Sequence, residues 1–322
     1  MFLLAVQRGH EDGIHNQSAK KESEQILKNV EKAYRHILCG LENHNSKTYV
    51  LSGSQAVSCL QLTKKQDANN FAYSKGDWAI AAGYDCASKL VDSVHRVAGR
   101  VIYEKPVWGL YAAIRGNAYS GRITAWNTVP TIEAIYYGQT PRFTFVSNRP
   151  LLVALALSGG EAKAVELNRN FITEYILYGY SMTSQSPYED VYILESTKAL
   201  EIYNGEIEKA EYPIGLKSRL KFNHTAADAG TELKNSLQNA MSRVSEQVRG
   251  SRIQLRLSGG KDSRALLSLL KQSGSNAYGV TFGRPHDEEV LISKYFADAA
   301  GVHLSAKCTN RGRWLSLCVA VA

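Results

Sequence analysis

Short apolar runs bounded by polar or turn residues fill the first two hundred residues and predict β-strands. Residues 1–6 are all apolar and are followed by the polar pair Gln7-Arg8. They predict the first strand of a sheet. Further strands are expected at 48–52 and 78–82. Paired runs around turn residues predict three hairpins, at 110–114 with 122–126, at 134–137 with 142–146, and around Asn204-Gly205 within 200–207.

Helical spacing interrupts these strands. Apolar residues four, three and four positions apart, at Ile26, Val30, Ala33 and Ile37, predict a helix within 23–39. Residues 168–180 also predict a helix. Hairpins with helices between them favour a layered α+β domain. Residues 213–225 are polar and basic without a clear period, so we expect a domain boundary there, with domains at 1–212 and 213–322.

The second region has a different pattern. Apolar residues between Leu233 and Val248 fall at spacings of four, four, three and four, which predicts a long amphipathic helix. A strand at 253–257, a glycine loop, a helix at 264–272, a strand at 277–282 and a helix from Asp287 to Gly301 follow in order. Strands that alternate with helices predict a doubly wound parallel sheet.

Composition fits a soluble two-domain protein, with 322 residues, 44% hydrophobic residues and 21% charged residues. The formal net charge is +8, but the cations are scattered in pairs such as Lys20-Lys21 and Lys64-Lys65, which argues against nucleic acid as the partner. The apolar start is too short for a signal peptide, and no run approaches the length of a membrane span. Five cysteines without metal-ligand spacing support neither disulfides nor zinc, so we expect a cytoplasmic protein.

The candidate chemistry lies in Ser258-Gly259-Gly260-Lys261-Asp262-Ser263, between a strand and a helix. A glycine pair lets the backbone approach a phosphate closely, and the amides and dipole at the helix start attract the anion. Ser258 and Ser263 add hydroxyl groups. A carboxylate beside polyphosphate makes sense if Asp262 holds Mg²⁺, which binds oxygen ligands and substrate phosphates together. The loop therefore predicts ATP and Mg²⁺ as ligands.

The loop is not a Walker sequence, so transfer of the γ-phosphate is not expected. The plainer structural interpretation is a tight turn with an acidic residue near a helix start. Lys261 points either at a phosphate oxygen or into solvent. His286 and His303 favour structural roles, and Trp108 and Trp126 are expected in the core of a sandwich.

The motif Leu257–Ser263 resembles that of the asparagine synthase-like proteins. The resemblance continues through Gly279–Phe282 and Asp287-Glu288 to His303, and it extends more loosely over 110–210. It implies an N-terminal Ntn-type glutaminase domain, an αββα sandwich, followed by an ATP pyrophosphatase domain of the PP-loop type. It also implies that Leu257 and Val280 contact the adenine nucleoside, that 258–263 hold the phosphates, and that Asp262 holds Mg²⁺.

The sequence departs from that family in three places. The glutaminase needs a cysteine at position 2, where this chain has Phe2, and Cys39 is expected in the core instead. Lys261 stands where the family has an apolar residue. The family's second motif, Ser-Gly-x-Gly-Ser-Asp, is absent from 308–322, which predicts an incomplete domain. Asn204-Gly205-Glu206 spells a glutamine-binding triplet, but we interpret it as a hairpin turn.

Three functions follow from these observations. The first is an asparagine synthase-like enzyme that adenylates a small-molecule or peptide carboxylate, releases pyrophosphate and transfers the acyl group to ammonia or an amine. The second is an ATP-binding remnant or fragment without turnover. The third and weakest is a PP-loop enzyme of tRNA modification, which the SGGKDS spelling and basic pI suggest. No membrane partner is expected, and a homodimer is possible.

Overall fold

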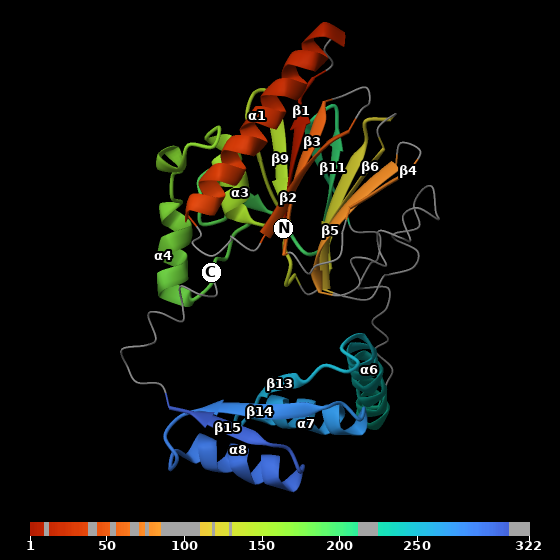
Figure 1. Ribbon diagram of the computed structural model, residues 1–322, viewed down its shortest axis with the longest axis vertical. Coiled ribbons are helices and arrows are strands. Elements are labelled where there is room, and N and C mark those ends of the chain that lie inside the picture. The colour runs from red at the N-terminus through yellow and green to blue at the C-terminus, as the bar shows by residue number, and fades with distance from the viewer. Residues whose placement is uncertain are drawn as a thin grey trace. The chain divides into compact units, whose positions relative to one another are not determined.

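The computed structural model describes residues 1–9, 13–37, 44–51, 56–64, 71–74, 77–84, 110–117, 120–128, 131–211 and 225–308. Its contacts divide the chain into two compact units, Met1–Arg219 and Leu220–Ala322. The sequence predicted the domain boundary within 213–225, and all of this segment except Thr225 lies outside the described residues. Figure 1 shows both units, which are described separately below.

The first strand occupies the interior of a six-stranded sheet in the N-terminal unit. This strand, β1 (Phe2–Gln7), is antiparallel to β3 (Val57–Lys64) on one side and to β9 (Phe143–Ser147) on the other. The sheet has the order β10-β8-β9-β1-β3-β2. Its remaining strands are β2 (His44–Leu51), β8 (Tyr136–Gln139) and β10 (Tyr192–Ile193). The predicted strand at the start of the chain is confirmed.

A second antiparallel sheet has the order β12-β11-β7-β6-β5-β4. Its strands are β4 (Phe71–Ser74), β5 (Asp77–Tyr84), β6 (Leu110–Asn117), β7 (Ile123–Asn127), β11 (Lys198–Tyr203) and β12 (Glu206–Glu211). All three predicted hairpins are present as antiparallel pairs. In the second hairpin, Gly138 and Gln139 belong to β8, so the turn begins later than the sequence predicted.

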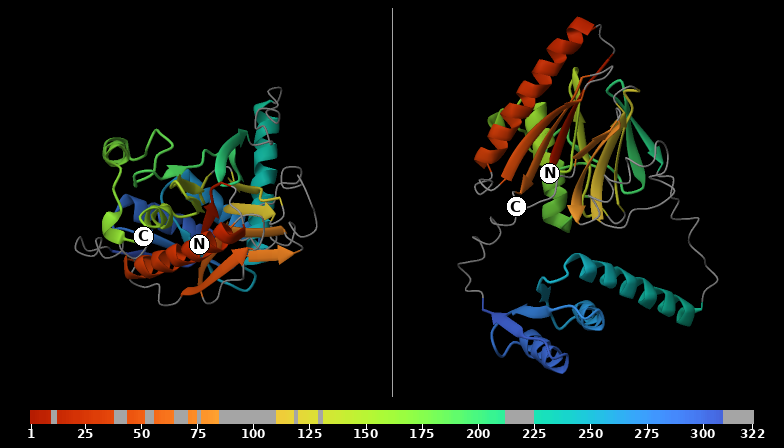
Figure 2. Two further views of the ribbon diagram at one scale, coloured as in Figure 1. Left: turned by 90° about the horizontal axis from the view of Figure 1, so that it is seen from above. Right: turned by 45° about the vertical axis from the view of Figure 1, so that its right-hand side comes forward.

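The two sheets pack face to face around one apolar cluster. Phe2, Leu4 and Val6 from β1 meet Ile114, Ile123 and Ile202 from the opposite sheet. Helices α1 (Gly13–Ile37) and α3 (Pro150–Leu157) cover the outer face of the first sheet through a second cluster that includes Leu3, Leu27 and Leu152. Figure 2 shows α1 on the outside of the stacked sheets.

The N-terminal unit therefore has a helical layer and two antiparallel sheets, three of the four layers of the predicted αββα sandwich. No helix among the described ranges covers the outer face of the second sheet, and 85–109 lie outside them. Trp126 is fully buried as predicted, but it packs on that outer face with Tyr111 and Ala113, and not between the sheets. Trp108 lies outside the described residues.

The helices of this unit also refine the sequence prediction. α1 begins ten residues before the predicted start, and its buried face runs through Ala19, Leu27, Val30 and Tyr34. Ile37 at its end is largely exposed, and Cys39 lies outside the described residues. A short 3₁₀ helix (Ala162–Ala164) and α4 (Arg169–Tyr178) follow α3; no residue of α4 is buried.

The C-terminal unit is built on a three-stranded parallel sheet. Its elements are α6 (Ala226–Gln247), β13 (Ile253–Arg256), α7 (Lys261–Gln272), β14 (Ala277–Phe282), α8 (Glu288–Ala299) and β15 (Leu304–Lys307). The sheet order is β13-β14-β15, with both pairs parallel. Thr225 starts α6 through a reciprocal capping box with Asp228. These elements agree with the β-loop-α-β-α order predicted from the sequence.

One apolar cluster holds this unit together. It joins Leu255 of β13 and Leu257, which follows that strand, with Leu267 of α7 and Ala297 of α8. Both helices therefore pack on the same face of the sheet, as right-handed crossovers in one direction require. A doubly wound sheet has helices on both faces, so the predicted second layer is not present among the described residues. No helix that the structure describes is long and apolar enough to cross a membrane.

Candidate functional site

The loop 257–260 leaves the carboxyl end of β13 and enters α7. Gly260 is the N-cap of that helix, with extended backbone angles, and Lys261 and Asp262 form the first turn. Because the amides of the first turn of a helix have no partner within the helix, they point out of its N-terminus. The helix begins three residues earlier than the sequence predicted, so Lys261, Asp262 and Ser263 belong to its first turn and not to a loop.

A hydroxyl network closes this loop. The Ser263 hydroxyl accepts a hydrogen bond from the Ser258 amide at 3.1 Å and lies 3.0 Å from the Ser258 hydroxyl. The Gly260 amide donates to the Ser258 hydroxyl at 3.2 Å. The two serines therefore bring the end of β13 and the start of α7 together, which fixes the direction of the loop amides. Both hydroxyls are used within the loop, so their first role is structural.

The two glycines differ in what the fold requires of them. Neither has a positive φ, so the backbone conformation does not demand glycine at either position. A Cβ at Gly260 would meet the Ser258 hydroxyl oxygen at 3.2 Å, a tight contact. A Cβ at Gly259 would meet only the Ile292 side chain, at 3.5 Å or more, which is an ordinary van der Waals contact. The packing of the protein alone therefore does not explain Gly259.

Asp262 and Lys261 are exposed at the mouth of this loop. Neither side chain makes an ion pair with any residue that the structure describes. A carboxylate at a helix start is favoured by the helix dipole, and the N-cap Gly260 provides no side-chain cap for this helix. Within the described ranges, no group of three or more acidic, histidine or cysteine side chains surrounds it.

Leu257 and Val280 lie side by side at the carboxyl ends of neighbouring strands. The Leu257 amide donates to the Val280 carbonyl oxygen at 2.9 Å. The Ser293 hydroxyl of α8 lies 3.1 Å from the Leu257 carbonyl oxygen, which ties the strand end to that helix. Both side chains are buried, so only their backbone faces the loop. The sequence carried no signal for Ser293, because its role depends on the packing of α8.

The start of β1 is the place where the family resemblance implied a glutaminase nucleophile. Phe2 is fully buried in the core between the sheets, and its amide donates to the Asn148 side chain at 2.9 Å. The α-amino group of Met1 donates to the Leu62 carbonyl oxygen at 2.8 Å. Position 2 therefore carries a core side chain here and offers no nucleophilic atom.

The Asn204-Gly205 turn is a two-residue hairpin, as predicted. Both residues have positive φ, 50° and 74°, and Tyr203 pairs with Glu206 across the turn. The Gly9 amide donates to the Asn204 carbonyl oxygen at 2.9 Å, and the Thr144 hydroxyl donates to that of Gly205. The tip of this hairpin therefore anchors the second sheet to the first.

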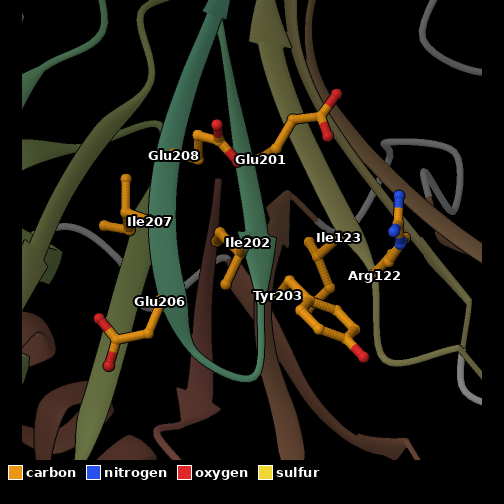
Figure 3. Close-up of a pocket in the computed structure, with 8 residues that line it drawn as sticks. All are labelled: Arg122, Ile123, Glu201, Ile202, Tyr203, Glu206, Ile207 and Glu208. Carbon is orange, nitrogen blue, oxygen red and sulfur yellow. The ribbon is translucent and has the colours of Figure 1, made fainter.

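The same hairpin lines a cavity of about 430 Å³, which Figure 3 shows. Arg122 lies over the Tyr203 ring, 5.4 Å from its centroid. Glu206 is bound by the Arg8 guanidinium at 2.9 Å. Because that carboxylate already has a cation, it is not available for the amino group of a glutamine. The structure supports the interpretation of this triplet as a turn.

The remaining candidates are the cysteines and histidines of the described ranges. Burial raises the pKa of the Cys59 thiol to about 12, against a smaller opposite effect of the N-terminal charge, so Cys59 is a neutral core residue. Cys308 is exposed and unpaired with any described cysteine. His286 lies in the turn before α8 and His303 immediately before β15.

No family model matches this chain, and no curated protein does. Among solved structures, glutamine phosphoribosylpyrophosphate amidotransferase from B. subtilis, complexed with ADP and GMP, is 9% identical, with a TM-score of 0.34, over 95% of this chain and 90% of that one. A protein described as the allosteric regulatory enzyme of purine biosynthesis is also 9% identical, with a TM-score of 0.31, over 97% of this chain and 66% of the other. Similarity this low assigns neither a family nor an activity, and the asparagine synthase-like family stays a prediction.

Proposed function

We propose that this protein binds Mg-ATP at the loop 258–263 and uses it to adenylate a carboxylate, in the manner of the asparagine synthase-like proteins that its loop resembles. One observation carries the proposal: Gly259 and Asp262 lie at the start of α7 with no structural task that the fold explains. A glycine that packing does not require, next to a carboxylate with no ion-pair partner among the described residues, fits a site that binds phosphate and its metal.

The ATP phosphates would lie at the N-terminus of α7. The Gly259 amide, the amides of the first turn of α7 and the helix dipole would bind the β- and γ-phosphate oxygens. Lys261 is exposed beside them and would neutralise further charge. The backbone of Leu257 and Val280, at the ends of β13 and β14, would contact the adenine nucleoside. These residues lie at the carboxyl edge of a parallel sheet, where open α/β sheets bind their ligands.

Asp262 would bind Mg²⁺ only when the phosphates of the nucleotide provide further ligands. It is one exposed carboxylate, and the described residues provide no further acidic ligand near it. Mg²⁺ commonly keeps several waters and binds through one or two carboxylates and substrate phosphates. Such an ion would neutralise the charge that develops on the leaving pyrophosphate. We therefore expect metal binding to depend on ATP.

The reaction balances without a further reagent. A carboxylate oxygen attacks the α-phosphorus of ATP, and the bond from that phosphorus to the bridging oxygen of the β-phosphate breaks, which releases pyrophosphate. Ammonia or an amine then attacks the acyl carbon of the acyl-adenylate, and AMP leaves. The acyl acceptor comes from outside this chain's N-terminal unit, because Phe2 provides no nucleophile for glutamine hydrolysis.

Binding tests the first half of the proposal. Asp262→Ala should weaken Mg-ATP binding by about 1–3 kcal/mol, the range for losing a charged partner, as measured by titration calorimetry. Asp298→Ala is the matched control, because Asp298 is an exposed carboxylate on α8 of the same unit. Equal affinity of the Asp262→Ala variant and the wild-type protein for Mg-ATP would exclude this site.

Pyrophosphate release tests the second half. The wild-type protein would be incubated with Mg-ATP, carboxylates such as aspartate, and ammonia or amines, with glutamine as a separate arm. Release that requires both Asp262 and a carboxylate supports adenylation, and glutamate production from glutamine would contradict the expected role of Phe2. The remnant alternative is favoured by the single phosphate loop among the described residues. ATP binding without pyrophosphate under every condition would establish that alternative.

A further inference from the structure

The parallel sheet of the C-terminal unit has one face that no described helix covers. Ile253, Leu255 and Leu257 point toward α7 and α8, so the residues between them point the other way. Strand register extends this face across β14 and β15, because Arg256 pairs with Val280 and Phe282 pairs with Lys307. We name these eight positions the open sheet face: Arg252, Gln254, Arg256, Tyr278, Val280, Phe282, Ser305 and Lys307. The Val280 side chain is buried, and the other seven are exposed or partly exposed.

The sequence of β13 favours a polar partner for this face, whereas β14 (277–282) contributes mainly aromatic and apolar side chains to it. A parallel strand buried on both faces reads as a continuous apolar run. Residues 252–257 instead alternate as Arg-Ile-Gln-Leu-Arg-Leu. Arg252, Arg256 and Lys307 are exposed, while Tyr278 and Phe282 are partly exposed. An apolar helix laid over this face would bury three cations without partners, at a large cost in desolvation.

Two cations are stacked on two aromatic rings. The Arg252 guanidinium lies 4.5 Å from the centroid of the Tyr278 ring, and the Arg256 guanidinium lies 5.0 Å from that of Phe282. Four residues along a strand separate the two pairs by ~13 Å. A guanidinium that stacks on a ring keeps its N–H groups at its edges, where they can bind anions. The Tyr278 hydroxyl donates to Gln254 at 2.7 Å, which fixes that ring as well.

We infer that the open sheet face binds a single strand of nucleic acid. None of its eight positions carries a carboxylate, and three carry a cation, so it complements a phosphate backbone. Planar guanidinium and aromatic groups on a sheet are the surfaces on which unpaired bases stack. Arg252 and Lys307 lie 55 positions apart in the chain, but the register of the three strands places both on the same face of the sheet.

The test is fluorescence anisotropy of the full chain with labelled oligo-dT and oligo-U of about 20 nucleotides, longer than the usual site on one domain. Three phosphate contacts predict a slope of about −2 for log affinity against log salt. The double variant Arg252→Ala/Arg256→Ala should bind at least about tenfold more weakly, with a slope near −0.7. A preference between the two oligomers shows whether RNA or DNA is favoured.

The matched control removes the same charge elsewhere. Lys234→Ala/Lys294→Ala takes two exposed cations from α6 and α8 and should change affinity less than about twofold. Phe282→Leu keeps every cation and should still weaken binding about fivefold, because the open sheet face loses one of its two aromatic rings. Absence of binding by the wild-type protein, or equal losses in both double variants, would overturn the inference. Equal competition by oligoglutamate of the same charge would also overturn it and would indicate an acidic protein partner.

Discussion

The two units differ in how they use the residues at which we looked for chemistry. In the N-terminal unit, the positions at which chemistry was sought carry the architecture: Phe2 fills the core between the sheets, and Gly205 anchors one sheet to the other. In the C-terminal unit, Gly259 and Asp262 stand at the edge of a sheet with no packing task. A residue is therefore a better candidate for chemistry when the fold does not already need it for packing or hydrogen bonding.

The largest expected effect comes from the core of the N-terminal unit. Phe2→Ala removes a fully buried ring and should lower the free energy of unfolding by about 3–5 kcal/mol. Urea denaturation followed by circular dichroism measures this loss. Ile132→Ala is the control, because Ile132 lies in the same unit but is 64% exposed. A loss below ~1 kcal/mol for Phe2→Ala would show that position 2 is not a core position, and the contrast between the units would fail.

Glycine substitutions sharpen the contrast at the hairpin tip. Gly205 has a φ of 74°, and a Cβ there would lie 2.4 Å from the Gln7 carbonyl oxygen. Gly205→Ala should therefore cost more than the ~1–2 kcal/mol of a left-handed alanine alone. Gly179→Ala isolates that smaller cost, because Gly179 has a φ of 78° and open space around its Cβ position. Equal unfolding free energies for the two variants would show that the hairpin does not dock on β1.

The smallest effect on stability is expected at Gly259. Gly259→Ala should leave the free energy of unfolding unchanged or raise it by up to ~1 kcal/mol, because the backbone tolerates alanine and the unfolded chain loses freedom. The same variant should weaken Mg-ATP binding about tenfold, since a Cβ would stand where a phosphate approaches. Calorimetry and denaturation on one preparation separate the two results. A destabilised variant would mean that packing, and not a ligand, requires this glycine.

Local patterns predicted most elements of both units. Alternating and bounded apolar runs identified β1, β5, β13 and β14, and turn residues located three hairpins, but the antiparallel pairs β2–β3 and β4–β5 were not predicted. The helix α3 was missed because Pro150–Leu157 is apolar on all sides, so it has no periodic signal. The prediction for α1 found Val30 but missed Leu27 and Tyr34, which are buried, whereas the predicted Ile26 and Ala33 are only partly buried against the same cluster.

The candidate site was only partly predictable. The phosphate loop is contiguous, so 258–263 could be read directly from the sequence. The open sheet face depends on register between strands that lie far apart in the chain, as with Arg256 and Phe282. The lack of a structural task at Gly259 is likewise visible only when its neighbours are known.

The central position of β1 sets the order in which the protein can assemble during synthesis. Leu3 pairs with Ser147, so after β1 leaves the ribosome it waits for a partner 144 residues behind it. At 5–20 residues per second that delay is about 7–30 seconds, during which an apolar strand has an unpaired edge. The parallel sheet has no such delay, because each of its strands meets the next after one helix. Nascent chains that end before β9 should therefore depend on chaperones or aggregate.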